Sequence, residues 1–212
     1  MNRRERRKAR KGKTTQRVLS GSNQSASGIA DLMVEAAKLY EAGDVRGAQS
    51  TYEMILTMKP TNADALFALG VLVEQKGDSE TAKQHYRTAI DSTPDHAPSL
   101  VNLGDMLRSE SKYSEAIELL ERAASVAAEI PLVHNNLGIA FHHSGNTEKA
   151  ILAFGKALEL DPCFSEANCN LGAVFADLER FDEAIDCFET ALKQAPENSI
   201  FLANLGLSLI HI

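Results

Sequence analysis

The fold is decided by residues 131–164, PLVHNNLGIAFHHSGNTEKAILAFGKALELDPCF, because the same pattern of residue types recurs 34 residues earlier and 34 residues later. At this interval the chain aligns with itself from Ile29 to the end. The alignment gives five full repeats and a partial sixth: 29–62, 63–96, 97–130, 131–164, 165–198 and 199–212. A fixed period of this length indicates a repeat architecture, in which each unit buries its apolar face against its neighbours.

Four columns of the alignment keep one residue type or size. The eighth place is small: Ala36, Gly70, Gly104, Gly138, Gly172 and Gly206. The twentieth place is alanine in every full repeat: Ala48, Ala82, Ala116, Ala150 and Ala184. The twenty-fourth place is large and mostly aromatic: Tyr52, Tyr86, Leu120, Phe154 and Phe188. The thirty-second place is proline except at Ala128: Pro60, Pro94, Pro162 and Pro196. With these columns the chain resembles the tetratricopeptide repeat (TPR) family.

The resemblance implies an all-α fold in which each repeat is a pair of helices, helix A over places 2–14 and helix B over places 18–30. The pairs are expected to stack into a right-handed superhelix, an α-solenoid of five helix-turn-helix repeats plus helix A of a sixth. Small residues at places 8 and 20 let the two backbones approach closely. The large side chain at place 24 is expected to fill the gap between repeats, and proline at place 32 to end helix B.

Two local features bear on where the helices of a repeat end. Gly43, Gly77 and Gly145 fall at the turn between helices, where a positive φ costs glycine little. In the third repeat Ala128 replaces the proline, and Pro131 follows three residues later. We therefore expect helix B of this repeat to be longer and less sharply ended.

Residues 1–28 form a tail whose charge differs from that of the rest of the chain. Its first 17 residues carry nine basic residues against Glu5, a net charge of +8, whereas residues 18–212 carry a net charge of −15. With almost no apolar residue to bury, the tail is predicted to be disordered. It can solubilise the chain, fold back on the acidic remainder, or bind nucleic acid or an anionic surface by counterion release, although it lacks interleaved aromatic residues for base stacking.

Composition excludes several classes of protein. Apolar residues make up 44% of the chain and charged residues 24%, which is ordinary for a fold with a buried core. No run of about 18 apolar residues predicts a membrane span, and no apolar stretch follows the basic start as a signal peptide requires. The three cysteines form no Cys-x-x-Cys pair. Because residues 1–7 resemble the opening of bacterial repeat proteins with a C-terminal transferase, we expect a location in the bacterial cytoplasm.

The last segment, residues 199–212, contains no Asp, Glu, Lys or Arg. The outer helix of a solenoid needs a polar face, since no neighbour covers it. We therefore expect an exposed apolar patch, self-association through this helix, and an array that continues beyond residue 206. Residues 207–212, LSLIHI, also resemble the translation of a sequencing adapter, with a native helix as the alternative.

Helix A is expected to line a concave groove, with places 2, 5, 6, 9, 12 and 13 facing it. Place 6 is asparagine in four successive repeats, each time in an Asn-Leu-Gly triplet: Asn102, Asn136, Asn170 and Asn204. This row of four asparagines is named the asparagine ladder. Asparagine is a poor helix former, costing about half a kcal/mol of helix stability relative to alanine, so its recurrence at place 6 indicates a role other than helix formation. Because a primary amide both donates and accepts, it can pair with the peptide unit of an extended ligand whatever the ligand's sequence.

This asparagine ladder resembles the one in the repeat region of O-GlcNAc transferases and their bacterial Spindly-like relatives. The resemblance implies that the asparagines hold the backbone of a protein substrate, and that the chain is the substrate-recruiting part of a larger glycosyltransferase. Val34 and Ala68 interrupt the ladder in the first two repeats. The other predicted groove residues are Asp105, Arg108, Asn135, His142, His143 and Asp177. As an alternative, the place-6 asparagines only make local contacts between neighbouring A helices.

No catalytic or metal-binding constellation is predicted. His142 and His143 are adjacent, so on a helix they diverge by about 100°. Cys163, Cys169 and Cys187 are expected in a loop, on the groove side and on a B helix. No phosphate loop, dinucleotide fingerprint or nucleophile elbow is found. We therefore expect a protein-binding scaffold that is not itself an enzyme and holds no cofactor or metal, with a stand-alone assembly adaptor or a nucleic-acid-associated adaptor as alternatives to the transferase arm.

Overall fold

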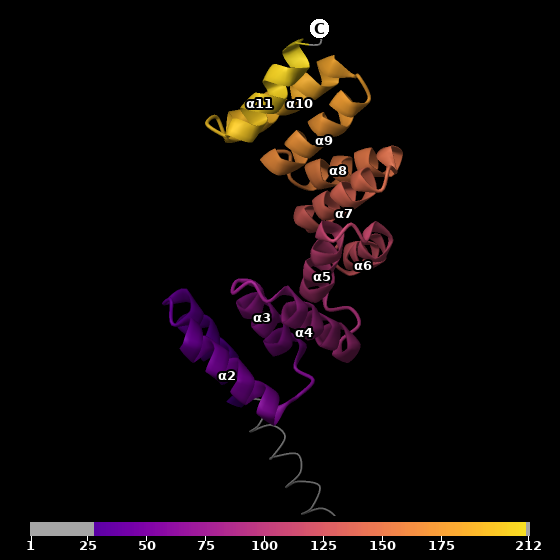
Figure 1. Cartoon of the computed structure of the whole chain (residues 1–212). Helices are drawn as coiled ribbons and strands as arrows, with labels where there is room; N and C mark the ends of the chain where they lie inside the picture. Colours follow the sequence, from indigo (N-terminus) through magenta and orange to yellow (C-terminus); the bar gives the residue numbers. More distant parts are fainter. Residues whose placement is uncertain (1–27, 211–212) are drawn as a thin grey trace, which may run out of the picture. The chain divides into compact units, whose positions relative to one another are not determined.

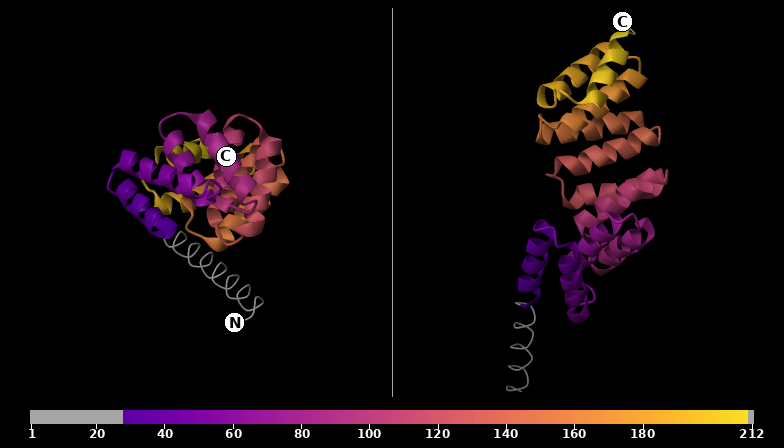
Figure 2. Two further views of the ribbon diagram at one scale, coloured as in Figure 1. Left: turned by 90° about the horizontal axis from the view of Figure 1, so that it is seen from below. Right: turned by 60° about the vertical axis from the view of Figure 1, so that its left-hand side comes forward.

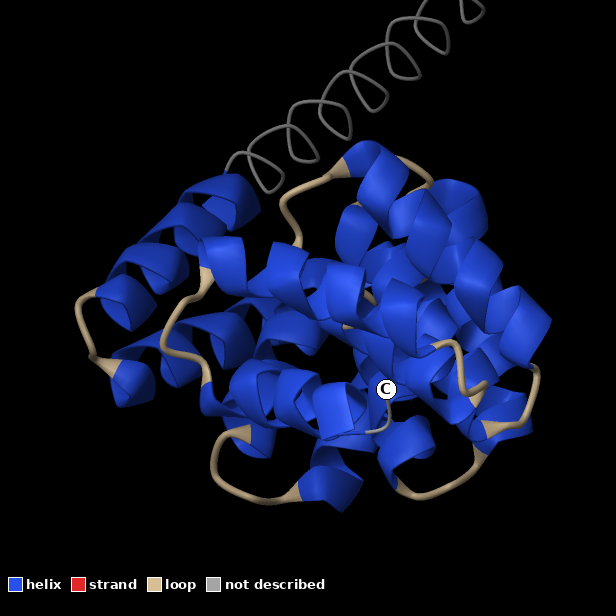
Figure 3. Ribbon diagram, turned by 90° about the horizontal axis from the view of Figure 1, so that it is seen from above, coloured by secondary structure: helices blue, strands red, loops and turns tan. Residues whose placement is uncertain are grey.

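The computed structural model describes residues 28–210, and every regular element in this range is a helix (Figure 3). The chain divides into two compact units, Met1–Ser92 and Thr93–Ile212. The first unit holds helical residues 28–41, α2 (Val45–Met58), α3 (Ala63–Glu74) and α4 (Ser79–Ser92) (Figure 1). The second holds α5 (Ala97–Ser109), α6 (Tyr113–Val126), α7 (Pro131–His143), α8 (Thr147–Leu160), α9 (Ser165–Asp177), α10 (Phe181–Gln194) and α11 (Ser199–Ile210). The predicted tail lies outside the described residues up to position 27.

The helices alternate as the predicted A and B elements. In the second unit α5, α7, α9 and α11 are A helices, and α6, α8 and α10 are B helices. α5, α7 and α9 each pack on the B helix that follows, and α5 contacts α7, α7 contacts α9, and α9 contacts α11. The right-hand view of Figure 2 shows these helices in successive layers along the chain. The predicted all-α solenoid of stacked helix pairs is therefore confirmed.

The eighth-place glycine of a repeat lies under the twenty-fourth-place side chain of the same repeat. A methyl group on Gly138 would lie 2.7 Å from ring carbons of Phe154, and one on Gly70 would lie 2.5 Å from the ring of Tyr86. Such separations are too short for carbon atoms, so the ring occupies the space that any larger residue would need. The small residue at place 8 therefore makes room for a side chain of helix B.

The twenty-fourth-place side chain also joins its own repeat to the next. Phe154 on α8 is fully buried, and it packs in one cluster with Leu137 and Phe141 of α7 and Val174 of α9. Burying a side chain of this size contributes about 1.5–3 kcal/mol of hydrophobic free energy. The expectation that this side chain fills the space between repeats is thus met. The same ring also packs helix B against helix A of its own repeat.

Turns between helices A and B share one backbone conformation, whether or not glycine is present. Gly43, Gly77 and Gly145 have φ angles of 82°, 84° and 80°. At the equivalent places of the third and fifth repeats, Ser111 and Glu179 have φ angles of 61° and 59°. The left-handed conformation costs a residue with a side chain about 1–2 kcal/mol. The turn is therefore imposed by the packing of the helices it connects.

The expectation of a longer helix B in the third repeat is wrong. α6 has 14 residues and ends at Val126, as α8 has 14 residues and ends at Leu160. Pro131 begins α7 and restricts the residue before it, so Ile130 is extended, with φ −99° and ψ 110°. The N–H of Ile130 donates to the carbonyl of Ala127 at 3.1 Å and closes the turn. Pro131, at the start of α7, thus takes over the helix-ending role of the proline that is absent at place 32 of the third repeat.

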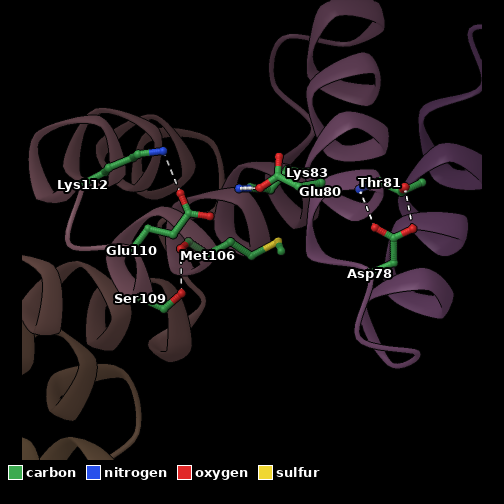
Figure 4. A network of polar contacts seen from close by, with 8 residues as sticks. All are labelled: Asp78, Glu80, Thr81, Lys83, Met106, Ser109, Glu110 and Lys112. Carbon is green, nitrogen blue, oxygen red and sulfur yellow. Dashed lines mark hydrogen bonds and ion pairs between the residues drawn. The ribbon is translucent and has the colours of Figure 1, made fainter.

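Short polar contacts fix helix ends within each unit (Figure 4). Before α4, the carboxylate of Asp78 accepts from the backbone N–H of Thr81 at 3.1 Å and from its hydroxyl at 2.7 Å. These two bonds hold the pKa of Asp78 below its usual value. After α5, the Lys112 ammonium lies 2.8 Å from the Glu110 carboxylate, and Ser109 donates its hydroxyl to a carbonyl of the last turn at 2.7 Å. Asp78 thus satisfies a backbone N–H that the start of α4 leaves unpaired, and the other contacts add side-chain bonds at the end of α5.

Several apolar side chains of α11 are exposed, as predicted for this helix. Ile200 is 65% exposed and Leu202 is 48% exposed. Phe201, between them, is buried in the cluster around Phe188. The helix therefore packs on the fifth repeat by one face only.

Replacing Gly138 with alanine is expected to lower the free energy of unfolding by about 1–3 kcal/mol, because the new methyl group collides with the Phe154 ring. Gly155→Ala on α8 is the matched control: nothing lies within 4 Å of the new methyl group. Alanine is favoured over glycine inside a helix, so this control should gain about 0.5–1 kcal/mol. Urea unfolding followed by circular dichroism measures both.

The same experiment in a Phe154→Ala background identifies the contact. Alanine lacks the ring atoms that the new methyl group would meet, so Gly138→Ala should cost less there than in the parent chain. An equal cost in the two backgrounds would contradict the assigned contact between place 8 and place 24.

Candidate functional site

All ten predicted site residues lie in the second unit, on its four A helices. α5 carries Asn102, Asp105 and Arg108, α7 carries Asn135, Asn136, His142 and His143, α9 carries Asn170 and Asp177, and α11 carries Asn204. The faces of α5, α7, α9 and α11 that bear these residues are named the A-helix wall. Because neighbouring A helices pack on each other, the wall is continuous from one repeat to the next.

Asn170 is linked to the preceding A helix by its side chain. Its Nδ2 group donates to Oδ1 of Asn135 at 3.0 Å, which joins α9 to α7. Asn135 was predicted to face the groove, but its side chain is only 4% exposed. Its burial is tolerated because the side chain is hydrogen-bonded: it accepts from Asn170 and donates to Oδ1 of Asn136 at 3.4 Å. Asn135 therefore supports the ladder residues from beneath.

Asn204 makes the equivalent link one repeat later. Its Nδ2 group donates to Sγ of Cys169 at 3.6 Å, which joins α11 to α9. Cys169 is 6% exposed, and burial raises the pKa of its thiol, although the bond from Asn204 opposes the shift. The neutral sulfur is a weak acceptor, so this link is weaker than the amide pair between Asn170 and Asn135.

Two of the ladder amides, those of Asn170 and Asn204, are bonded to the preceding A helix and still have hydrogen-bonding capacity. Asn102, Asn136, Asn170 and Asn204 are all partly exposed. A primary amide carries two hydrogens on nitrogen and two lone pairs on oxygen, and one bond to a neighbouring helix uses a single hydrogen. The predicted local contacts between A helices therefore exist for Asn170 and Asn204, and they are compatible with a ligand on the exposed side of the amide.

Charged residues of the A-helix wall form pairs. Arg108 donates from Nε and Nη2 to Oδ1 of Asp105 at 3.0 and 2.8 Å within α5. Nε2 of His142 lies 2.9 Å from Oδ2 of Asp177, which links α7 to α9. The wall thus carries both basic and acidic side chains that contact one another, so it does not present a field of one sign to a ligand.

His143 is held differently from its neighbour His142. Its ring stacks on Tyr113 of α6, with ring centroids 5.8 Å apart. Burial, followed by the nearby positive charges of Arg108 and His142, lowers the pKa of His143. The two histidine rings are 5.9 Å apart between centroids and are tilted by 55°, so they do not present their nitrogens to one point.

Reasoning from the sequence missed Tyr113 and the support given by Asn135 and Cys169. The supporting contacts follow a fixed separation in the sequence. Asn135–Asn170, Cys169–Asn204 and His142–Asp177 each join residues 35 positions apart, one more than the repeat length. A search for polar pairs at this separation would have found the links between A helices.

The described residues contain no cluster of three or more His, Cys, Asp or Glu side chains that could hold a metal ion. Between residues 28 and 210, no helix combines the length and the apolar character needed to cross a membrane.

Replacing Asn170 with alanine is expected to lower the free energy of unfolding by about 1–3 kcal/mol, because the buried oxygen of Asn135 loses its donor. In a double-mutant cycle, Asn135→Ala together with Asn170→Ala should cost less than the sum of the two single changes. Asn204→Ala is the matched ladder variant and should cost less, since it releases only a thiol. Strictly additive costs at positions 135 and 170 in urea unfolding would disprove the assigned bond.

Comparison with known proteins agrees with this arrangement. Three family models described as tetratricopeptide repeat match residues 35–97, 95–162 and 165–198. The probable UDP-N-acetylglucosamine–peptide N-acetylglucosaminyltransferase SPINDLY of Hordeum vulgare is 28% identical over 156 residues. This match covers 70% of the present chain but only 16% of the barley protein, so the chain spans a small part of that relative's length.

Solved structures share the fold. The Pseudomonas aeruginosa protein pilF superposes with a TM-score of 0.77 at 20% identity, over 88% of this chain and 86% of pilF. YrrB, described as a TPR protein with an unusual peptide-binding site, gives a TM-score of 0.68 at 20% identity, over 81% of this chain and 89% of YrrB. Because the three matching segments cover most of residues 35–198, the chain belongs to the tetratricopeptide repeat family.

Proposed function

We propose that the A-helix wall binds an extended segment of a partner protein, with the asparagine ladder as the element that holds the ligand's backbone. The observation that carries this proposal is the recurrence of a partly exposed asparagine at place 6 of four successive A helices. A single asparagine inside a helix has many explanations. Four in register form a row of equivalent amides along the direction in which the repeats stack.

The links between helices favour this role because they orient the amides in advance. Asn170 and Asn204 are each held by a bond to the preceding A helix, so their side chains are already ordered. Ordering a flexible side chain at an interface costs about 0.5–1.5 kcal/mol, and a group ordered beforehand avoids much of that cost. The remaining donor and acceptor positions of each amide match the C=O and N–H groups of a peptide unit.

We further propose that the chain is the substrate-recruiting part of a larger protein, such as a bacterial O-GlcNAc-transferase-like glycosyltransferase. The resemblance of the ladder to that family and the match to a SPINDLY protein support this assignment. YrrB, with the same fold and a peptide-binding site, supports the coarser statement that such a wall can bind a peptide. In this role the repeat region binds, and the chemistry belongs to a separate catalytic domain.

Selection from a random 12-residue phage-display library tests peptide binding without knowledge of the natural ligand. The immobilised chain is expected to enrich a set of peptides. These peptides should bind the parent chain at least about tenfold more tightly than they bind the Asn136→Ala/Asn204→Ala variant, which corresponds to a loss of about 1.4 kcal/mol or more of binding free energy. These two positions are chosen because their bonds are longer than the one between Asn170 and Asn135: Asn136 accepts from Asn135 at 3.4 Å, and Asn204 donates to the Cys169 sulfur at 3.6 Å. Fluorescence anisotropy measures each affinity.

Glu118→Ala/Glu189→Ala is the matched control, since both glutamates are exposed on B helices. This variant should bind the selected peptides like the parent. Equal melting temperatures would show that both double variants keep the fold. Enriched peptides whose affinity is the same for the ladder variant, or no enrichment at all, would contradict the proposal.

A further inference from the structure

The asparagine ladder has a regular spacing along the wall. α7, α9 and α11 pack as neighbours, and the bonds Asn170–Asn135 and Asn204–Cys169 join them at the same level. Packed helices lie about 8–10 Å apart between their axes. The place-6 amides therefore recur about every 8–10 Å along the wall.

A polyproline II helix has this period. It turns once in three residues and rises about 3.1 Å per residue, so equivalent atoms recur about every 9.3 Å along one edge. A β-strand covers about 10 Å in three residues, but its groups alternate with a period of two. Successive asparagines of the ladder would therefore meet opposite sides of a β-strand. They would meet the same side of a polyproline II helix.

The backbone of a polyproline II helix is also chemically available. It has no internal hydrogen bonds, so its C=O and N–H groups are free to pair with a partner. An asparagine amide can donate to the C=O and accept from the N–H of one residue. Only every third residue needs an N–H group, and the two residues between can be proline.

The charge of the wall indicates what the ligand carries. Arg108 and Asp105 form an ion pair within the wall, and His142 contacts the carboxylate of Asp177. One helical turn from Asn136 and Asn170, at place 9, are the apolar residues Ile139 and Ala173. The apolar residues beside these two asparagines complement an uncharged ligand with an apolar side chain at every third residue.

We propose that the A-helix wall binds a proline-rich, uncharged segment in the polyproline II conformation, in which one residue in three contacts the asparagine ladder. This inference rests on the proposed function, peptide binding through the same asparagines, and names the class of peptide that the wall takes.

Fluorescence anisotropy with the full chain and three labelled 12-residue peptides tests the period and the conformation. The first peptide, (Leu-Pro-Pro)4, has the period of three residues and the polyproline II conformation. The second, (Leu-Pro-Leu-Pro-Pro-Pro)2, has the same composition and conformation without the period of three. The third, (Leu-Gly-Ser)4, has the period but is flexible. The first should bind at least about tenfold more tightly than the others, and Asn136→Ala/Asn204→Ala should remove that advantage while Glu118→Ala/Glu189→Ala keeps it.

The outcomes separate this inference from the function on which it rests. If the three peptides bind equally, or if (Leu-Pro-Pro)4 binds the ladder variant as well as the parent, the polyproline II assignment is overturned. If library-selected peptides without a proline period bind in a ladder-dependent way and (Leu-Pro-Pro)4 does not bind, peptide binding stands and the assignment falls. If neither the library nor the three peptides yield ladder-dependent binding, both proposals fail.

Discussion

The contact between the eighth-place glycine and the twenty-fourth-place side chain is the constraint on which the rest of the structure depends. It appears with a tyrosine at Gly70, with a leucine at Gly104 and with phenylalanines at Gly138 and Gly172. The missing side chain on helix A allows helix B to place a large group against the helix A backbone. That group then lies in one buried cluster with a residue of the next repeat, as Phe154 does with Val174. One contact thus fixes both the pairing of helices and the spacing of repeats.

The spacing of repeats in turn produces a second regularity, a displacement of one residue between consecutive A helices. His142 and Asp177 pair at places 12 and 13 of neighbouring repeats. In the first unit, Gln75 donates to the hydroxyl of Tyr40 at 2.7 Å, at the same two places. The Asn135–Asn170 and Cys169–Asn204 links follow the same rule at places 5 and 6. The ladder amides are therefore positioned by the stack itself, and local sequence need not position them.

The repeat columns predicted the helices because packing acts on residue size, and size is visible in the sequence. Helix B of a repeat with proline at place 32 is predicted to end at place 30, as α8 and α10 do in the structure. The length of α6 was mispredicted because proline at place 32 was treated as the cause of the helix end, whereas Pro131 of the next helix also suffices. The left-handed Glu179 could not be predicted, since only tertiary packing overrides its preference. The buried position of Asn135 depends on the displacement between helices, which the period alone does not contain.

The claim that the asparagine ladder holds a peptide backbone is tested most directly by nuclear magnetic resonance of the side-chain amides. The signals of Asn102, Asn136, Asn170 and Asn204 would be followed while an unlabelled library-selected peptide is added to the ¹⁵N-labelled chain. The account predicts that these NH₂ signals shift together, at one affinity, along with backbone signals of α5, α7, α9 and α11. Shifts confined to α6, α8 and α10, with the four ladder amides unmoved, would contradict it.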